Sequence, residues 1–112
     1  MQKMFVRFAP TAFLISFTIL VLPAGTRAQS DAAKLFKTDC SPCHGPDGSG
    51  NTQTGKALKA KDLRSDEVQK QSDAELAAII SKGRNKMPAF GWKFSPDVIN
   101  SLVVYIRQMA KK

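Results

Sequence analysis

The run Cys40-Ser41-Pro42-Cys43-His44 constrains this 112-residue chain more than any other feature of its sequence. Two thiols three positions apart on a helical turn lie on one side of the backbone, and an imidazole follows the second thiol directly. Each thiol can add to one vinyl group of the same porphyrin, which leaves the imidazole under the ring with a nitrogen facing the iron. The spacing therefore predicts a covalently attached c-type haem on Cys40 and Cys43, with His44 as an axial iron ligand.

Residues 1–28 have the features of a secretory signal peptide. Lys3 and Arg7 precede a mostly apolar stretch over 9–22, and small residues stand before a cleavage point that we place after Ala28. The alternative is an uncleaved membrane anchor, but the stretch is shorter than the roughly 20 residues that a spanning helix needs, and a proline interrupts it. We therefore expect a periplasmic or otherwise exported protein without a membrane anchor.

Residues 29–112 make one small domain of 84 residues, and its size also favours a bound group. The whole chain has a formal charge of +8, and three of its cations precede residue 29, which leaves +5 on the domain. A domain of this length buries little core and usually needs a disulfide, a metal or a cofactor for stability. A disulfide between cysteines at i and i+3 would constrain little of the unfolded chain, whereas a haem offers a large apolar surface.

Three helices are predicted, and no segment alternates like a strand. The first helix spans about 31–39, with Ser30 as its N-cap, and leads into the haem motif. The chain over 45–61 is rich in Gly, Pro, Asp, Ser, Asn and Thr and is expected to be a loop, while 62–68 is either loop or a short helical turn.

The other two helices have strong start signals. The second opens at Ser72, which forms a capping box with Glu75, and it ends at Gly83. The third starts at Ser95 with Pro96 at its first position. The domain is therefore predicted to be all-α.

A second iron ligand would have to come from one of the two methionines of the domain. Met109 falls in the last turn of the third predicted helix, a poor place for a ligand. Met87 precedes Pro88 in an irregular segment, from which a thioether can point at the iron without breaking a helix. Filling a gap in the core is the other use of such a methionine. We predict that Met87 is the ligand, since His/Met is the usual pair for electron-transfer haems of this type.

The motifs together resemble those of the small class I cytochromes c, particularly the short bacterial and photosynthetic electron carriers. The resemblance covers nearly all of residues 29–112. Its elements are C-x-x-C-H-G at 40–45, D-G-x-G at 47–50, S-D-x-E-L at 72–76, G-x-x-x-M-P at 83–88 and L-V-x-Y-I-R at 102–107. It implies a cytochrome c fold, with three main helices and loops around one haem c per chain.

In that family the first and last helices cross. Phe36 holds the family's aromatic position four residues before the first haem cysteine, and Leu102 with Tyr105 matches its partner pair. Ala32 stands where the family often has a glycine at the closest approach of the two helices, so we expect a slightly wider crossing.

The resemblance also assigns the site residues. It makes Cys40 and Cys43 the thioether links, His44 the proximal ligand and Met87 the distal ligand. The other ring nitrogen of His44 is expected to donate to a backbone carbonyl within 46–58.

Three aromatic residues follow Met87 in the sequence. Trp92 either contacts a haem propionate or packs in the core, and both alternatives remain open here. Phe90 and Phe94 are expected to form the wall of the haem pocket.

A haem with two protein ligands has no open position for oxygen or a substrate. We therefore predict an electron carrier of a respiratory or photosynthetic chain, not an enzyme, with a potential raised by the methionine. The alternatives are a five-coordinate haem sensor or peroxidase-like protein, and a haem subunit of a larger oxidoreductase. A redox dithiol would expect a βαβ context, and a zinc site would need a fourth ligand.

The expected partners are other redox proteins. Four basic residues surround Met87 in sequence and could steer the protein, as a monomer, to acidic surfaces on a reductase or terminal oxidase. These residues are Lys82, Arg84, Lys86 and Lys93. The alternative is an ordinary solvated basic face, and nucleic acid is not an expected partner.

Overall fold

The computed structural model describes residues 17–21 and 25–110. These residues form helices and connecting chain, and within them the backbone makes an isolated antiparallel bridge between Arg84 and Met87 but no strand. The prediction of an all-α fold is therefore confirmed. Most of the predicted signal peptide, including Lys3 and Arg7, lies outside the described residues, so its cleavage after Ala28 stays a prediction. None of the described helices is long and apolar enough to cross a membrane.

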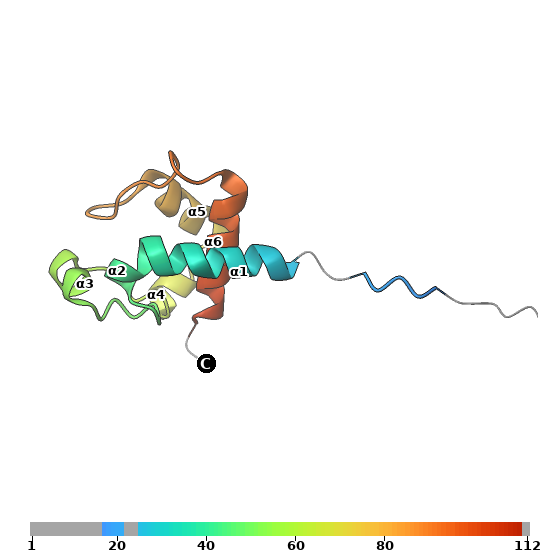
Figure 1. Ribbon diagram of the computed structural model, residues 1–112. Coiled ribbons are helices and arrows are strands. Elements are labelled where there is room, and N and C mark those ends of the chain that lie inside the picture. The colour runs from blue at the N-terminus through green and yellow to red at the C-terminus, as the bar shows by residue number, and fades with distance from the viewer. Residues whose placement is uncertain (1–16, 22–24, 111–112) are drawn as a thin grey trace, which may run out of the picture.

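One continuous helical stretch leads into the haem motif (Figure 1). It consists of α1 (Gly25–Leu35), the π-helical turn η1 (Phe36–Cys40) and α2 (Ser41–His44). The predicted start at Ser30 is wrong, because the Ser30 hydroxyl donates to the carbonyl of Arg27 inside the helix. The residues before Ser30 include good helix formers, so the helix continues back past a residue that could have capped it.

The expected loop over 45–61 contains a helix, α3 (Gln53–Leu58). Thr52 caps it by accepting a hydrogen bond from the Gly55 amide at 2.8 Å, and the same hydroxyl is 3.1 Å from the Cys43 carbonyl oxygen. A Cβ on Gly55 would stand 2.1 Å from that carbonyl oxygen, so glycine is required for α3 to pack this closely on α2. Glycine in a short helix lowers its helix propensity, and therefore the local pattern over 45–61 indicated only a loop.

The last two helices begin where their caps predicted, and a further short helix lies in the ambiguous segment. The ambiguous segment over 62–68 contains the start of α4 (Asp66–Gln69), and α5 (Asp73–Lys82) opens with the complete capping box and ends at Gly83. The last helix, α6 (Pro96–Gln108), begins directly after its N-cap, Ser95.

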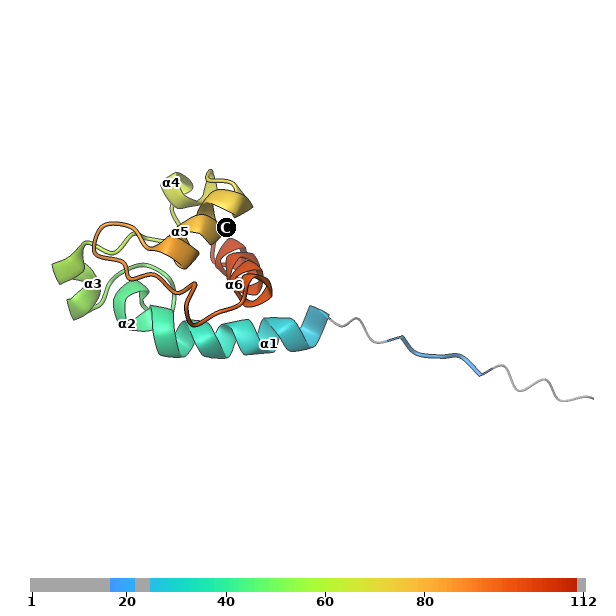
Figure 2. The same cartoon turned by 90° about the horizontal axis from the view of Figure 1, so that it is seen from above.

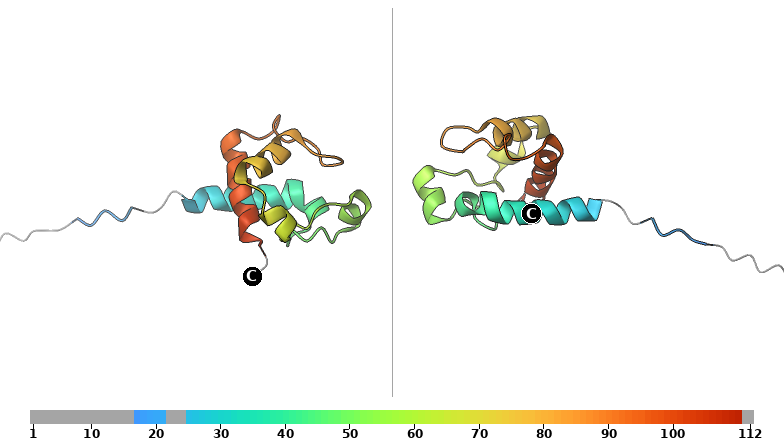
Figure 3. Two further views of the ribbon diagram at one scale, coloured as in Figure 1. Left: turned by 180° about the vertical axis from the view of Figure 1, so that it is seen from behind. Right: turned by 45° about the horizontal axis from the view of Figure 1, so that its top comes forward.

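The core lies where α1 and its continuation η1 cross α6 (Figures 1 and 2). Ala32 and Phe36 are buried on one side of the crossing, and Leu102, Val103 and Ile106 are buried on α6. Figure 3 shows α5 next to α6, where it adds Leu76 and Ile80 to the same core. Because of this crossing, the haem motif lies on one side of a cavity and the chain that follows α5 lies on another side of it.

Candidate haem-binding site

The side chains that were predicted to bind a haem line one cavity of about 310 Å³. Cys40, Cys43 and His44 line it from η1 and α2, and Met87 lines it from the chain that follows α5. That chain is orange in Figures 1 and 2, and it faces α2 and α3. The four residues predicted to attach and ligate a haem are thus brought together from distant parts of the sequence.

The rest of the cavity wall is largely apolar. Phe90 and Phe94 both line it, as expected, and their rings stack with centroids 5.7 Å apart. The other apolar residues include Phe36, Leu63, Val68, Leu76, Ile80, Leu102 and Ile106. An apolar cavity with a few polar groups converging on it is the usual form of a cofactor site, and two thiols with an adjacent imidazole fit a haem.

The two methionines of the domain occupy different environments. Met87 lines the cavity, whereas Met109 packs against the buried core near Gly48 and is not part of the cavity wall. The Met87 segment is held by two backbone hydrogen bonds with Arg84, of 2.9 and 3.1 Å. This arrangement favours Met87 as a ligand on geometric grounds.

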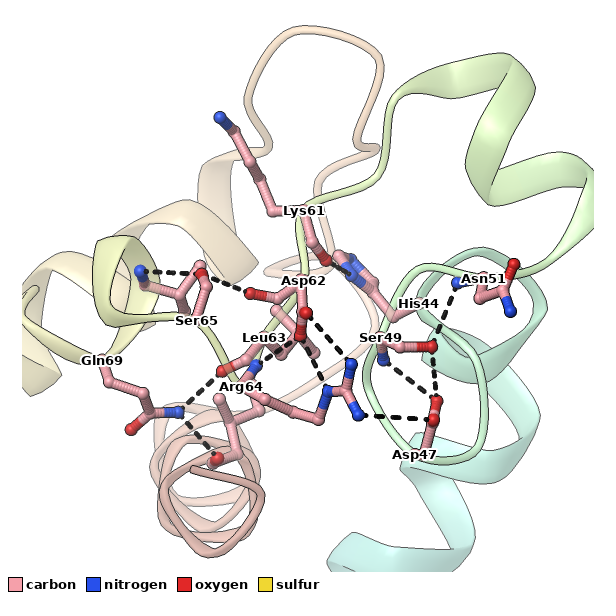
Figure 4. Close-up of polar contacts among 12 residues, drawn as sticks. His44, Asp47, Ser49, Asn51, Lys61, Asp62, Leu63, Arg64, Ser65 and Gln69 are labelled. Atoms are coloured by element: carbon pink, nitrogen blue, oxygen red, sulfur yellow. Dashed lines mark hydrogen bonds and ion pairs between the residues drawn. The ribbon is translucent and has the colours of Figure 1, made fainter. Parts of the chain in front are cut away.

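The ring of His44 is held by a backbone carbonyl, although in a different segment from the one expected. Nδ1 lies 2.9 Å from the carbonyl oxygen of Lys61, which Figure 4 shows beside the ring. The expected range 46–58 was wrong because α3 takes up part of it, and its carbonyls accept from helix amides, as Thr52 accepts from Lys56. Since a carbonyl can only accept, Nδ1 carries the proton, and Nε2 keeps the lone pair that a metal needs.

No disulfide joins Cys40 and Cys43 in the described structure, and both side chains are partly buried. Burial raises the pKa of Cys40 to about 12, and the neighbouring Asp39 carboxylate adds to this effect. A thiol with so high a pKa forms very little thiolate at neutral pH, whereas redox-active dithiols depend on a lowered pKa. The raised pKa of Cys40 therefore does not favour the redox dithiol.

Trp92 is one of the most exposed residues of the domain, with 83% of its surface accessible. The alternative that it packs in the core is wrong. The amide of the preceding residue, Gly91, donates to the Ser81 carbonyl at 3.0 Å, and a Cβ on Gly91 would stand 2.5 Å from the Ser81 hydroxyl oxygen. That glycine is therefore pressed against α5, while Trp92 is left in solvent. Its contact with a propionate remains a prediction.

Basic and acidic side chains also line the cavity. Arg84 and Lys86 line it together with Glu67, which pairs with Lys61 at 2.8 Å. Lys93 pairs with Asp39, another lining residue, and Lys82 is exposed but lies outside the lining. Of the four basic residues predicted to surround Met87, only Arg84 and Lys86 therefore line the cavity.

A segment that the sequence did not single out also supports the site. Lys61 supplies the carbonyl for His44, and Asp62 and Arg64 form a network with Asp47 beside it (Figure 4). No local motif marks Lys61 or Arg64 for this role, because their contacts with His44 and Asp47 join parts of the chain that are distant in sequence.

Comparison with known proteins agrees with this geometry. A family model described as "Cytochrome C oxidase, cbb3-type, subunit III" matches residues 27–106. The cytochrome c6 of Gloeothece citriformis is 30% identical over 95 residues, which cover 82% of this chain and 81% of that protein. The "Cbb3-type cytochrome c oxidase subunit FixP" of Azorhizobium caulinodans is 34% identical over 89 residues, but the chain spans only 29% of its length.

A solved structure has the same fold. The c-type cytochrome KustC0563 superposes with a TM-score of 0.66 at 33% identity, covering 71% of this chain and 98% of that one. The family model matches well over half of the chain. The protein therefore belongs to this cytochrome c family and is a small class I c-type cytochrome, an electron carrier with covalently bound haem c.

Proposed function

We propose that this cytochrome shuttles single electrons between redox partners through a haem attached to Cys40 and Cys43, with His44 and Met87 as the axial iron ligands. The observation that carries the proposal is that all four residues line one apolar cavity, which Met109 does not reach. When bound, the haem supplies a reversible one-electron couple, and a methionine ligand places its potential toward the oxidising end of a respiratory or photosynthetic chain.

The side chains of the protein hold this group and exclude other chemistry. His44 presents Nε2 to the cavity because Nδ1 donates to Lys61. The backbone of Met87 is held by two hydrogen bonds with Arg84, so the side chain with its thioether extends from an ordered turn. The apolar wall would exclude water from the bound haem, and with His44 and Met87 both ligating the iron no position would remain for a substrate.

The cavity also lacks a group suited to acid–base catalysis. The chain has one histidine, which the proposal uses as a ligand. The lining carboxylates Asp39 and Glu67 are both ion-paired with lysines. The proposed role is therefore that of a carrier, not of an enzyme.

The carrier is proposed to work outside the cytoplasm as a monomer, after cleavage of its signal peptide behind Ala28. Its proposed partners are a reductase or a terminal oxidase with an acidic docking surface. That surface is proposed to contact this protein near the cavity residues Arg84 and Lys86. A second candidate is a haem subunit of a larger oxidoreductase, because one relative is named as an oxidase subunit. Size-exclusion chromatography of a native extract separates the two, since a carrier elutes alone and a subunit elutes with the oxidase.

Optical spectra of the protein matured with its haem test the ligands. We expect a weak far-red band in the oxidised protein and no change of the reduced spectrum with carbon monoxide. Met87→Leu should abolish the band and open the iron to carbon monoxide, whereas the matched variant Met109→Leu should change neither. Rapid carbon monoxide binding to the unmodified protein would instead indicate a sensor or a peroxidase-like protein.

A further inference from the structure

The carbonyl that holds His44 belongs to a segment that is cross-linked by one arginine. The Arg64 guanidinium donates through Nε to one oxygen of Asp62 at 3.0 Å and through Nη2 to the other at 3.1 Å. The Asp62 carboxylate also accepts from the Arg64 amide at 2.9 Å. This bidentate ion pair fixes the plane of the guanidinium group, which a lysine ammonium could not do.

The remaining nitrogen of the same guanidinium reaches the loop that follows His44. Nη1 lies 3.7 Å from a carboxylate oxygen of Asp47, and that carboxylate accepts from the amide and the hydroxyl of Ser49 at 3.0 and 2.7 Å. These two hydrogen bonds, with a smaller contribution from Arg64, hold the pKa of Asp47 below its usual value. Figure 4 shows Arg64 between the two aspartates, beside the His44 ring.

Backbone hydrogen bonds make the same connection. The Leu63 amide donates to the Gly48 carbonyl at 2.8 Å, and the Gly50 amide donates to the carbonyl of His44 at 2.6 Å. The loop over 45–50 therefore lies between the residue that carries the imidazole and the segment that carries its acceptor. Arg64 is the side chain that ties this loop to that segment.

The far side of the segment is anchored to α6. The Gln69 side-chain amide donates to the Leu63 carbonyl at 2.7 Å and to the Ile106 carbonyl at 3.1 Å. The Ser65 hydroxyl donates to the Asp62 carbonyl at 2.6 Å. With this side fixed, Arg64 and the backbone hydrogen bond between Leu63 and Gly48 hold the other side of the segment.

We propose that Arg64 is a positioning residue that keeps the Lys61 carbonyl on Nδ1 of His44 by clamping Asp62 to Asp47. The inference rests on the proposed ligand role of His44. A hydrogen bond from the second ring nitrogen fixes the orientation of a ligating imidazole and raises its basicity, which stabilises the oxidised metal. The clamp should therefore lower the reduction potential and protect the ring proton from exchange.

The test compares two arginines in the haem-containing protein. Arg64→Lys keeps the positive charge but cannot form the bidentate ion pair with Asp62. The matched control is Arg107→Lys, because Arg107 has a side-chain exposure of 27% against 32% for Arg64 and also binds an aspartate, Asp73. Its other hydrogen bonds go to the backbone carbonyls of Gln69 and Gln71, and not to the Gln69 side chain that anchors the segment.

Exchange of the His44 ring proton with solvent, followed by NMR in the reduced protein, gives the decisive reading. Arg64→Lys should accelerate it about tenfold, as expected when a charge-assisted hydrogen bond is weakened. The same variant should raise the reduction potential, because the charge is kept while the imidazole becomes less basic. Arg107→Lys should leave both quantities at the values of the unmodified protein.

Equal exchange in Arg64→Lys and the unmodified protein, or equal acceleration in the two variants, would overturn the proposal. If Arg64→Lys does not mature with its haem, Asp47→Asn gives the same comparison, since it removes only one arm of the clamp. Failure of the proposed function would show itself separately, as carbon monoxide binding to the unmodified protein.

Discussion

The ring of Phe36 lies 5.2 Å from the ring of Tyr105, centroid to centroid, with the two planes inclined at 52°. This contact joins η1, which carries the first haem cysteine, to α6 near the end of the domain. Tilted aromatic pairs at this distance add to the stabilisation from buried area alone. The helix crossing thus supports both the core and the wall that carries Cys40.

Leu102 provides a direct test of the crossing, since none of its surface is exposed. Leu102→Ala should reduce the free energy of unfolding by about 2–5 kcal/mol, because a buried leucine is replaced by a cavity. Guanidinium unfolding of the haem-containing protein measures the change. Val104→Ala is the matched control on the same helix, since Val104 is 52% exposed, and it should change stability by no more than about 0.5 kcal/mol. Similar losses in both variants would contradict this account of the core.

Gly83 links the end of α5 to the Met87 segment. Its φ is +76°, and a Cβ there would stand 2.7 Å from the Met87 carbonyl oxygen. Gly83→Ala should therefore shift the segment and weaken the proposed bond between Met87 and the iron. Carbon monoxide should then bind to the reduced variant, as stopped-flow absorbance would show. Lys82→Ala, one residue earlier in an exposed position, should leave the protein inert to carbon monoxide. If carbon monoxide does not bind to the reduced Gly83→Ala variant, the prediction is wrong and the segment tolerates the added methyl group.

Glu75 makes the stability of α5 depend on pH. The Ser72 amide and hydroxyl hold the pKa of the Glu75 carboxyl below its usual 4.5, the backbone hydrogen bond being the larger cause. A lowered pKa in the folded state stabilises the protein above pH 4.5, and that stabilisation is lost as the pH falls through the lowered value. Glu75→Gln should therefore be less stable than the unmodified protein at pH 6, and the gap should close toward pH 3. Urea unfolding across this range measures the gap, and a constant gap would contradict the linkage.

Arg84 and Lys86 are the basic residues around Met87 that line the cavity. The double variant Arg84→Glu with Lys86→Glu should slow oxidation of the protein by membranes of its own organism about tenfold at low salt. The difference should shrink as salt screens the charges. The double variant Lys56→Glu with Lys70→Glu controls for the same change of net charge, since both lysines are exposed and not part of the cavity wall, and it should have a much smaller effect. An unchanged rate for the double variant at low salt would rule out docking at this face.

Features that depend on neighbouring residues could be predicted from the sequence. The capping box of α5 and the N-cap of α6 each join a side chain to an amide three residues away, so the local sequence contains the whole interaction. Met87 could be distinguished from Met109 as the candidate ligand from the local sequence. The sequence places Met109 in the last turn of a helix and Met87 in an irregular segment before a proline. The placement of Met87 in the cavity wall agrees with that choice.

Several features that depend on distant residues could not be predicted from the local sequence. α3 is stabilised by contacts of Thr52 with the carbonyls of Pro42 and Cys43, which no pattern within α3 reveals. Trp92 is exposed because Gly91 packs on α5, although a lone tryptophan in a small domain is also consistent with a buried position.

Five consecutive residues are enough to specify the chemistry of this protein, because they hold two thiols and an imidazole in the order that covalent haem attachment requires. How that imidazole is held depends instead on packing between distant segments. Its acceptor, the Lys61 carbonyl, is 17 positions away, and it reaches Nδ1 because α3, the loop over 45–50 and Arg64 pack together. Covalent order along a chain sets which groups are adjacent, but packing between segments sets which distant groups meet.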